Sequence, residues 1–460
     1  MKHTHFTKSA VFLKAICFWS LIIVQIGCTV KNDKQHQEEQ KSNRVKIEDV
    51  DRGIRMHISK EVAANDGYFH YEGDTLALEL KLVRVHTEYL SVLGSNEFFA
   101  CVDLATVDGD VYDVDFFLKG TADSMEVTST NLHKLNGKPY YTWKQAKDKT
   151  WTTVPVKNAS NDLLGVIEGQ DRFTFTYQVI LPELNTEARM WLPLAQSDRF
   201  QQIERQQINA PGDYRIIREV THGNEILFME LAPVHSNQVV TVTYNVVREE
   251  KSPYREDDIN RDMYLTGTPL IPVTERFATI AQEALIKRNA STPLSEARAL
   301  YDYVIDNMRY AKQGTYGTGD ANYACDSKSG NCTEFHSFFI ALAMSVGIPA
   351  RFAVGASIPS ERDEGGVNGY HCWAEFYAEG KWWPVDISEA NKYTPLATYY
   401  FGHHPANRIE FSRGRNLEFS PGPASGSVPF MAYPIFEING ESAHVKTNFS
   451  FERKSEDASS

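Results

Sequence analysis

A cysteine at the start of a predicted helix is the first residue that could do chemistry. Residues 330–336 read Gly-Asn-Cys-Thr-Glu-Phe-His, and the apolar stretch from Cys332 to Val346 predicts a buried central helix. Asn331 is a favourable N-cap and places Cys332 in the first helical turn. There the free backbone N–H groups and the helix dipole favour a thiolate, and the same N–H groups can stabilise an oxyanion formed when the sulfur attacks a carbonyl. The segment therefore predicts a nucleophilic cysteine.

A histidine and an aspartate follow on two predicted strands. His371 begins one strand and Asp386 ends the next, with Ala-Glu-Gly at 378–380 as the turn between them. In an antiparallel hairpin, residues at these two positions lie opposite each other or one diagonal away, within reach of a hydrogen bond. The imidazole can then accept the thiol proton while the carboxylate fixes its tautomer. We therefore expect Cys332, His371 and Asp386 to act as nucleophile, general base and orienting group.

These residues carry a resemblance to a known family. The segment from about residue 295 to 420 resembles bacterial members of the transglutaminase-like (papain-like cysteine enzyme) superfamily. The matching motifs are Gly-Asn-Cys-Thr-Glu-Phe-His at 330–336, Val-Gly-Ile-Pro-Ala-Arg at 346–351, Gly-Tyr-His-Cys-Trp-Ala-Glu-Phe at 369–376 and Trp-Pro-Val-Asp at 383–386. Their order and spacing both agree with the family. The resemblance implies the same catalytic roles for Cys332, His371 and Asp386, and it implies that residues 165–250 form the β-sandwich that often precedes this core.

Two aromatic residues are candidates for substrate contacts. Where relatives have Gly-Trp-Gly before the cysteine motif, this chain has Thr-Tyr-Gly at 315–317, so we expect Tyr316 to lie beside the site. Trp373 follows His371 by two residues. It can line a groove for an extended substrate or pack in the core, and the sequence leaves both alternatives open.

The other cysteines of this region have structural interpretations. We expect Cys325 and Cys372 to be packing residues, and alternation along the strand places Cys372 on the face opposite His371. A disulfide between Cys325 and Cys332 in an oxidising compartment is the alternative.

The nearby histidines are also expected to be structural. His336 lies on the same predicted helix as Cys332 and is expected to make a structural hydrogen bond, because His371 has the carboxylate partner. His403 and His404 lack the spacing of a zinc site. We therefore expect no metal and no cofactor.

The first 27 residues have the pattern of an export signal. Three lysines precede an apolar run over residues 15–26, which is too short to span a bilayer. Gln-Ile-Gly-Cys at 25–28 resembles a bacterial lipobox with Gln in place of the usual Leu, and this implies lipidation of Cys28 after cleavage. A plain secretory signal is the alternative. We expect a membrane-anchored lipoprotein, periplasmic or at the cell surface, with a flexible tether over residues 28–50.

The periodicity of apolar residues divides the remaining chain into folded blocks. Alternation over residues 51–164 predicts a β-rich N-terminal domain with a hairpin turn at Asp108-Gly109, and alternation over residues 165–250 predicts a β-sandwich. Residues 251–445 change to helical spacing and then to strands, which predicts the enzyme domain. Residues 446–460 are expected to be a polar tail. The predicted fold class is α+β, with a papain/transglutaminase-like core preceded by β-sandwich-type N-terminal domains.

The overall composition excludes several classes of protein. The 460 residues are 42% hydrophobic and 23% charged, which is ordinary globular usage. The 60 acidic residues outnumber the 47 basic ones, and no basic stripe is present that could follow a phosphate backbone, so we expect no nucleic-acid partner. Six cysteines are too few for a disulfide scaffold.

The predicted function is that of an exported cysteine enzyme. It would cleave or transfer acyl groups at amide bonds of proteins or peptides through a thioester. Hydrolysis, as a protease or amidase, is favoured because water is always present; a protein-glutamine amine transferase that crosslinks proteins shares the chemistry up to the thioester. A non-catalytic surface binding or assembly lipoprotein is a further alternative, and the complete triad argues against it.

Overall fold

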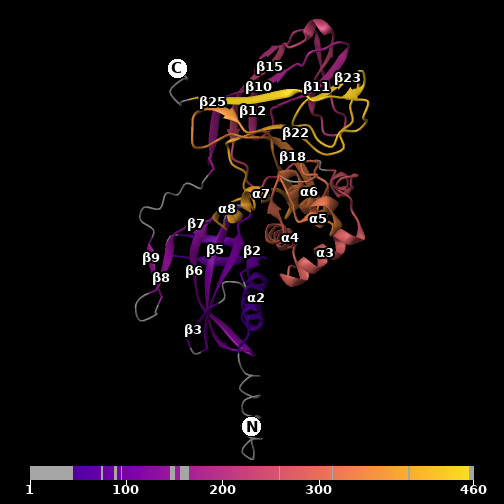
Figure 1. Ribbon diagram of the computed structural model, residues 1–460. Helices are drawn as coiled ribbons and strands as arrows, with labels where there is room; N and C mark the ends of the chain where they lie inside the picture. Colours follow the sequence, from indigo (N-terminus) through magenta and orange to yellow (C-terminus); the bar gives the residue numbers. More distant parts are fainter. Residues whose placement is uncertain are drawn as a thin grey trace, which may run out of the picture.

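The computed structural model places the chain in a strand-rich N-terminal domain, a central helical domain and a β-sandwich (Figure 1). It describes residues 45–73, 76–86, 91–94, 96–145, 151–155, 165–257, 260–312, 314–391 and 394–454. The predicted signal peptide, Cys28 and most of the predicted tether lie outside these residues. Within the described part of the chain, no helix has both the length and the apolar character needed to cross a bilayer.

The N-terminal domain is an antiparallel sheet with one face covered by helix α2 (Ile47–Ala64). Apolar residues every four positions along α2, namely Val50, Ile54 and Ile58, are buried against the apolar side chains of the sheet. The Asp108-Gly109 turn joins two paired strands, as predicted. In sheet order the strands are β1 (Phe69–Glu72), β2 (Ala77–Val85), β4 (Glu97–Ala105), β5 (Val111–Thr121), β6 (Ser124–Leu135) and β7 (Lys138–Pro139); β3 (Ser91–Gly94) pairs with β4, and β8 (Tyr141–Gln145) and β9 (Trp151–Pro155) form a separate hairpin.

One boundary predicted for this region is wrong. The tether predicted over residues 28–50 runs into α2, which begins at Ile47 and covers the apolar face of the sheet. Only three large apolar residues of α2 are buried, so its apolar stripe is narrow within an otherwise polar segment. The period-two pattern of the following strands is the stronger signal.

The β-sandwich consists of two five-stranded sheets that share one apolar core. The alternating residues of its two longest strands, which include Phe175 and Tyr244, are buried as predicted. One sheet has the order β12 (Gln201–Asn209), β15 (Val239–Glu249), β10 (Gln170–Ile180), β25 (Lys446–Arg453) and β19 (Glu364–Val367). The other has the order β13 (Tyr214–Arg218), β14 (Glu225–Leu231), β11 (Ala188–Leu194), β23 (Ile435–Ile438) and β24 (Glu441–Ser442).

The C-terminal residues complete this sandwich, so the prediction of a polar tail over 446–460 is wrong for its first half. Strand β25 pairs with β10 along eight residues and is drawn in yellow beside it in Figure 1. Within β25 only Phe449 and Phe451 point into the core, and the other residues of the strand are polar. Two inward phenylalanines on an otherwise polar strand give too short an alternation to predict a strand from the sequence.

The central domain packs helices on a four-stranded antiparallel sheet, which is the predicted α+β layout. Helix α6 (Cys332–Ser345) lies at its centre, with every residue from Cys332 to Met344 buried. The predicted hairpin is formed by β20 (His371–Ala378) and β21 (Lys381–Val385). The sandwich also contains η2 (Pro233–His235). The other elements of the central domain are η3 (Arg261–Leu265), α3 (Glu275–Lys287), α4 (Pro293–Asn307), β16 (Arg309–Tyr310), α5 (Ala321–Ser327), β17 (Ser329–Gly330), β18 (Ala350–Ser357), α7 (Ile387–Ala390), α8 (Thr394–Tyr399) and β22 (Arg408–Arg413).

Ion pairs join the N-terminal sheet to the central domain. Arg298 of α4 lies 2.8 Å from Asp103 of β4, and Arg84 of β2 lies 2.7 Å from Asp302 of α4. Asp103, Arg298 and Asp302 are buried. Removing one partner of these ion pairs would therefore leave the other as an unpaired charge away from water. These ion pairs therefore fix the N-terminal sheet directly against α4.

Candidate active site

The N-terminal end of α6 presents Cys332 as the sequence predicted. Asn331 caps the helix: its side-chain oxygen accepts a hydrogen bond from the backbone N–H of Thr333 at 2.8 Å. In the reciprocal hydrogen bond, the Glu334 carboxylate accepts the backbone N–H of Asn331 at 3.0 Å, and the two bonds together form a capping box. Within the described residues the N–H of Cys332 has no hydrogen-bond acceptor, so it is a candidate donor to an oxyanion.

Gly330 allows the chain to approach this helix end closely. Its φ is +159°, and a Cβ at this position would lie 2.4 Å from Cβ of Glu334. Any other residue would push the chain away from the capping box. Gly330 is therefore needed for the close packing that positions Cys332 at the start of α6.

Glu334 has a second role that the sequence did not reveal. Its other carboxylate oxygen accepts the backbone N–H groups of Gly317 and Gly319, each at 2.8 Å. Arg415 donates to the carbonyl oxygens of Thr318 and Gly319 in the same loop, at 3.0 and 3.1 Å. These two buried side chains fasten the loop that follows Tyr316 to the start of α6.

The β20–β21 hairpin brings His371 and Asp386 together. Ala374 pairs with Val385, which puts the two residues one diagonal apart, as predicted. The Nε2 atom of His371 lies 2.6 Å from Oδ2 of Asp386. The other oxygen of Asp386 accepts hydrogen bonds from the Ser388 hydroxyl at 3.0 Å and the Glu389 N–H at 3.1 Å. The carboxylate is thus fixed in position and can orient the imidazole.

The electrostatics of the site favour an ion pair. Burial alone would raise the pKa of the Cys332 thiol, but hydrogen bonds with Cys372 and His371 outweigh burial and lower it to about 6. Burial alone would lower the pKa of His371, but the Asp386 carboxylate, followed by Cys332, raises it to about 10. The pKa of Asp386 is lowered against the effect of burial, mainly by His371. At neutral pH the site therefore holds a thiolate, an imidazolium and a carboxylate.

His336 makes the structural hydrogen bonds that the sequence favoured. Its Nε2 accepts the backbone N–H of Ile387 at 3.0 Å, so Nδ1 must carry the proton that it shares with the carbonyl oxygen of Cys332 at 2.7 Å. Burial lowers the pKa of His336 to about 4, which keeps the ring neutral. The residue joins α6 to the start of α7.

Cys372 contributes more than the expected packing. It lies on the opposite face of β20 from His371, where its sulfur is 3.8 Å from Nδ1 of His336 and hydrogen bonded to Cys332. That hydrogen bond lowers the pKa of Cys332, whereas burial, followed by Cys332, raises the pKa of Cys372. Cys372 therefore stays a thiol beside the thiolate. Cys325 and Cys332 are both free, so the alternative disulfide is not formed.

The structure separates the two predicted substrate contacts. Tyr316 is 38% exposed and precedes the loop that Glu334 fastens, so it remains a candidate. Trp373 has no exposed surface, and its ring lies 4.3 Å from that of His404. Of the two alternatives for Trp373, its burial favours core packing: alternation on β20 places it on the same face as His371, but His404 covers it.

Other aromatic residues surround the cysteine instead. The phenol groups of Tyr310, Tyr370 and Tyr433 each have a raised pKa. Burial is the main cause, and electrostatic interaction with Cys332 adds to it in each case. Tyr310 is 47% and Tyr433 40% exposed, and Tyr370 accepts a hydrogen bond from the Asn331 side chain at 3.1 Å. We call Tyr310, Tyr316, Tyr370 and Tyr433 the tyrosine rim. Its members come from three separate parts of the chain, and Tyr316 is the one that a local motif predicted.

Comparisons with known proteins point to the domain that holds these residues. Residues 280–387 match the family described as the transglutaminase-like superfamily. An uncharacterized protein of Haemophilus influenzae is 24% identical over 321 residues, which cover 58% of this chain and 86% of that protein. Among solved structures, a candidate cysteine protease from Cytophaga hutchinsonii is 15% identical and covers 62% of this chain and 99% of its own, with a TM-score of 0.43. The periplasmic domain of TgpA from Pseudomonas aeruginosa is 16% identical and covers 57% of this chain and 86% of its own, with a TM-score of 0.28.

Proposed function

We propose that this chain is a cysteine enzyme acting on amide bonds of proteins or peptides, since its residues 280–387 match the transglutaminase-like superfamily. The observation that carries this proposal is the site itself. A thiol with a lowered pKa lies at a helix N-terminus and interacts with an imidazole that a buried carboxylate holds at 2.6 Å. A purely structural cysteine has no need of this arrangement.

The chemistry follows from the protonation states. The Cys332 thiolate attacks the carbonyl carbon of the amide, and the oxyanion that forms is stabilised by the backbone N–H of Cys332. The His371 imidazolium donates its proton to the departing nitrogen, which leaves as an amine and yields a thioester on Cys332. Neutral His371 then accepts a proton from the incoming acceptor, and the collapse of the second oxyanion releases the acyl group and restores the thiolate. Asp386 stabilises the imidazolium before each proton donation.

The tyrosine rim supports a peptide as the substrate. Tyrosine rings offer apolar faces and a hydroxyl, which suits contact with an extended chain of mixed side chains. Tyr310 and Tyr433, which interact with Cys332, are exposed, as is Tyr316, whereas the cysteine itself is only 2% exposed. A flexible peptide segment can reach such a recessed sulfur more easily than a rigid folded surface can.

We favour water as the acceptor, so that the enzyme is a protease or amidase. Water is present at any open site, whereas a transferase must exclude it and provide a channel for an amine. Incubation of the purified chain with casein and a fluorescent primary amine tests this choice. We expect cleavage products with little label; incorporation of the amine without cleavage would instead support the crosslinking alternative.

We further propose that the chain is exported and held at a membrane by a lipid on Cys28. The support is the lipobox-like sequence at residues 25–28. Fractionation of cells that express Cys28→Ser provides the test. We expect the variant to leave the membrane fraction, and its retention there would contradict the proposed anchor.

A further inference from the structure

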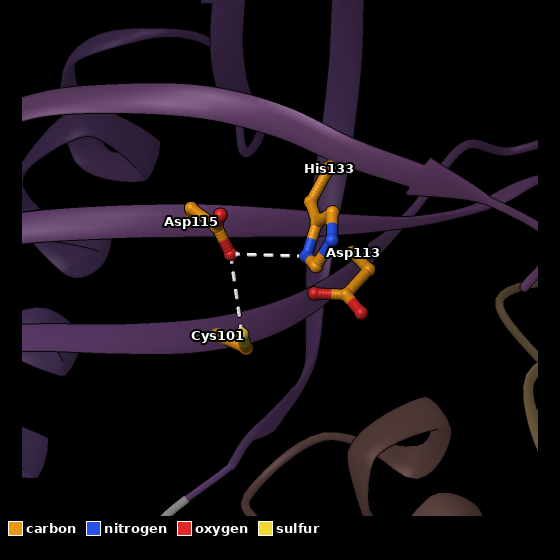
Figure 2. Close-up of side chains that lie close together, drawn as sticks. All are labelled: Cys101, Asp113, Asp115 and His133. Carbon is orange, nitrogen blue, oxygen red and sulfur yellow. Dashed lines mark hydrogen bonds and ion pairs between the residues drawn. The ribbon is translucent and has the colours of Figure 1, made fainter. Parts of the chain in front are cut away.

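We propose that the N-terminal sheet contains a structural site for a divalent transition-metal ion of the zinc class, with Cys101, Asp113, Asp115 and His133 as ligands (Figure 2). One possible ligand atom from each residue lies within 4.8 Å of the others. The site is on the opposite face of the sheet from α2 and does not include any residue of the Cys332 site. The inference therefore stands independently of the proposed enzymatic activity.

Sheet register brings the four residues together from three neighbouring strands. Cys101 of β4 pairs directly with Asp115 of β5, and Asp113 lies two residues along β5 on the same face. The β5–β6 ladder has a bulge at this point: Asp113 pairs with Lys134 and Val114 with Leu132, which leaves His133 as the extra residue. Bulges redirect side chains, and this one allows both His133 and Lys134 to face the carboxylates.

The distances are close to those of a tetrahedral zinc site. The sulfur of Cys101 lies 3.1 Å from Oδ1 of Asp115, and Nδ1 of His133 lies 3.3 Å from the same oxygen. With zinc–nitrogen and zinc–oxygen bonds of about 2.0–2.1 Å and a zinc–sulfur bond of about 2.3 Å, tetrahedral ligands are separated by roughly 3.3–3.6 Å. Small side-chain adjustments would thus be enough to surround an ion, and Figure 2 shows the four side chains converging on one point.

Burial leaves part of this cluster unsatisfied. Asp113 is 4% and Asp115 0% exposed, so two carboxylates lie close together away from water. Lys134 binds one oxygen of Asp113 at 2.6 Å, but within the described residues the other oxygen, Oδ1, has no hydrogen-bond partner. An orphaned carboxylate oxygen inside a protein is costly, and a cation among these ligands would satisfy it.

The donor set indicates which ion fits. One sulfur, one imidazole nitrogen and two carboxylate oxygens match Zn²⁺, whereas Mg²⁺ and Ca²⁺ prefer oxygen ligands alone. In the structure the Cys101 thiol donates its proton to Asp115, and metal binding would release that proton as the sulfur–metal bond forms.

Four protein ligands leave no open position on a tetrahedral ion, so the site would be structural. It would connect β4, β5 and β6, and through the Tyr141 hydroxyl, which donates to Asp115 at 2.6 Å, it would also hold the β8–β9 hairpin. Asp103, two residues from Cys101 on β4, carries the ion pair with Arg298 of the central domain. The ion would thus stabilise the part of the sheet that contacts α4.

Cobalt substitution tests the proposal. The full chain is prepared with Cys332→Ala, so that Cys332, His371 and Asp386 cannot bind metal together; it is then stripped with chelator and titrated with Co²⁺. We expect one Co²⁺ per chain, a strong sulfur-to-cobalt absorption band, and displacement by one equivalent of Zn²⁺. Adding Cys101→Ser should remove the band and weaken Zn²⁺ binding at least about tenfold. Cys325→Ser, another buried cysteine, should change neither property.

Two outcomes would overturn the site. The first is the absence of Co²⁺ and Zn²⁺ binding at micromolar concentrations, and the second is a cobalt band that survives Cys101→Ser. If Cys101→Ser fails to fold, by circular dichroism, Asp113→Asn decides the question because it preserves the shape of the side chain. An unchanged Zn²⁺ affinity in that variant would contradict the proposal, and a loss of at least about tenfold would support it.

Discussion

The Cys332→Ala variant is expected to lose at least about 10⁴-fold in turnover on any substrate of the wild-type chain. The variant lacks the sulfur that forms the thioester, and the neighbouring Cys372 has a raised pKa and so stays a neutral thiol. The fold should survive, because the change removes a single buried atom and should cost about 1 kcal/mol of unfolding free energy. Initial rates on casein and a thermal unfolding curve measure both effects.

Cys325→Ala is the matched control for this variant. Cys325 is a free, buried cysteine on the neighbouring helix α5, and it takes no part in the site. Its replacement should leave turnover essentially unchanged. Full activity of Cys332→Ala, or an equal loss in the two variants, would contradict the assignment of Cys332 as nucleophile.

Asp386→Asn is expected to lower kcat by roughly 10²- to 10⁴-fold. The amide keeps the size of the side chain but removes the charge that raises the pKa of His371. The imidazolium then loses its proton at lower pH, so the alkaline limb of the pH–rate profile, which we expect near pH 10 in the wild type, should move to lower pH. A pH series of kcat/KM on both proteins measures the shift, because kcat/KM reports the ionisation of the free enzyme.

An exposed carboxylate serves as the control for this second variant. Asp326 on α5 is two-thirds exposed and pairs with Arg276 at the surface. Asp326→Asn should preserve both kcat and the position of the alkaline limb. An Asp386→Asn variant with a reduced rate but an unmoved limb would show that Asp386 supports the fold rather than the charge of His371.

The three central residues could be predicted because their signals are local. Asn331 as an N-cap, the apolar run behind it and the Glu379-Gly380 turn each depend on neighbouring residues only. Once the helix and the hairpin are placed, His371 and Asp386 must lie within one diagonal of each other. The structure adds the long-range link, because packing of α6 against β20 brings Cys332 to His371.

The parts that the sequence missed depend on tertiary packing. Glu334 reads as an ordinary capping residue, and only the folded loop shows that its second oxygen binds Gly317 and Gly319. Cys372 follows His371 and must face the other way, yet α6 places Cys332 within its reach. Contacts of this kind leave no periodic pattern in a single sequence.

The same reason explains the errors at the two ends of the described chain. Helix α2 has too few apolar residues to stand out before a run of alternating strands. Strand β25 is mostly polar because one of its faces is exposed, and it becomes a strand through pairing with β10, more than 260 residues earlier. Sequence periodicity detects an element by its own apolar face and cannot detect a distant partner.

The ionisation of Cys332 in the wild-type chain tests the central claim most directly. The rate of alkylation of each cysteine by iodoacetamide can be followed against pH by mass spectrometry. We predict that the Cys332 rate rises with an apparent pKa of about 6 and exceeds that of Cys325 at neutral pH. A Cys332 rate that rises only near pH 8.5, the ordinary range of a thiol, and matches Cys325 would contradict the account and favour a non-catalytic scaffold.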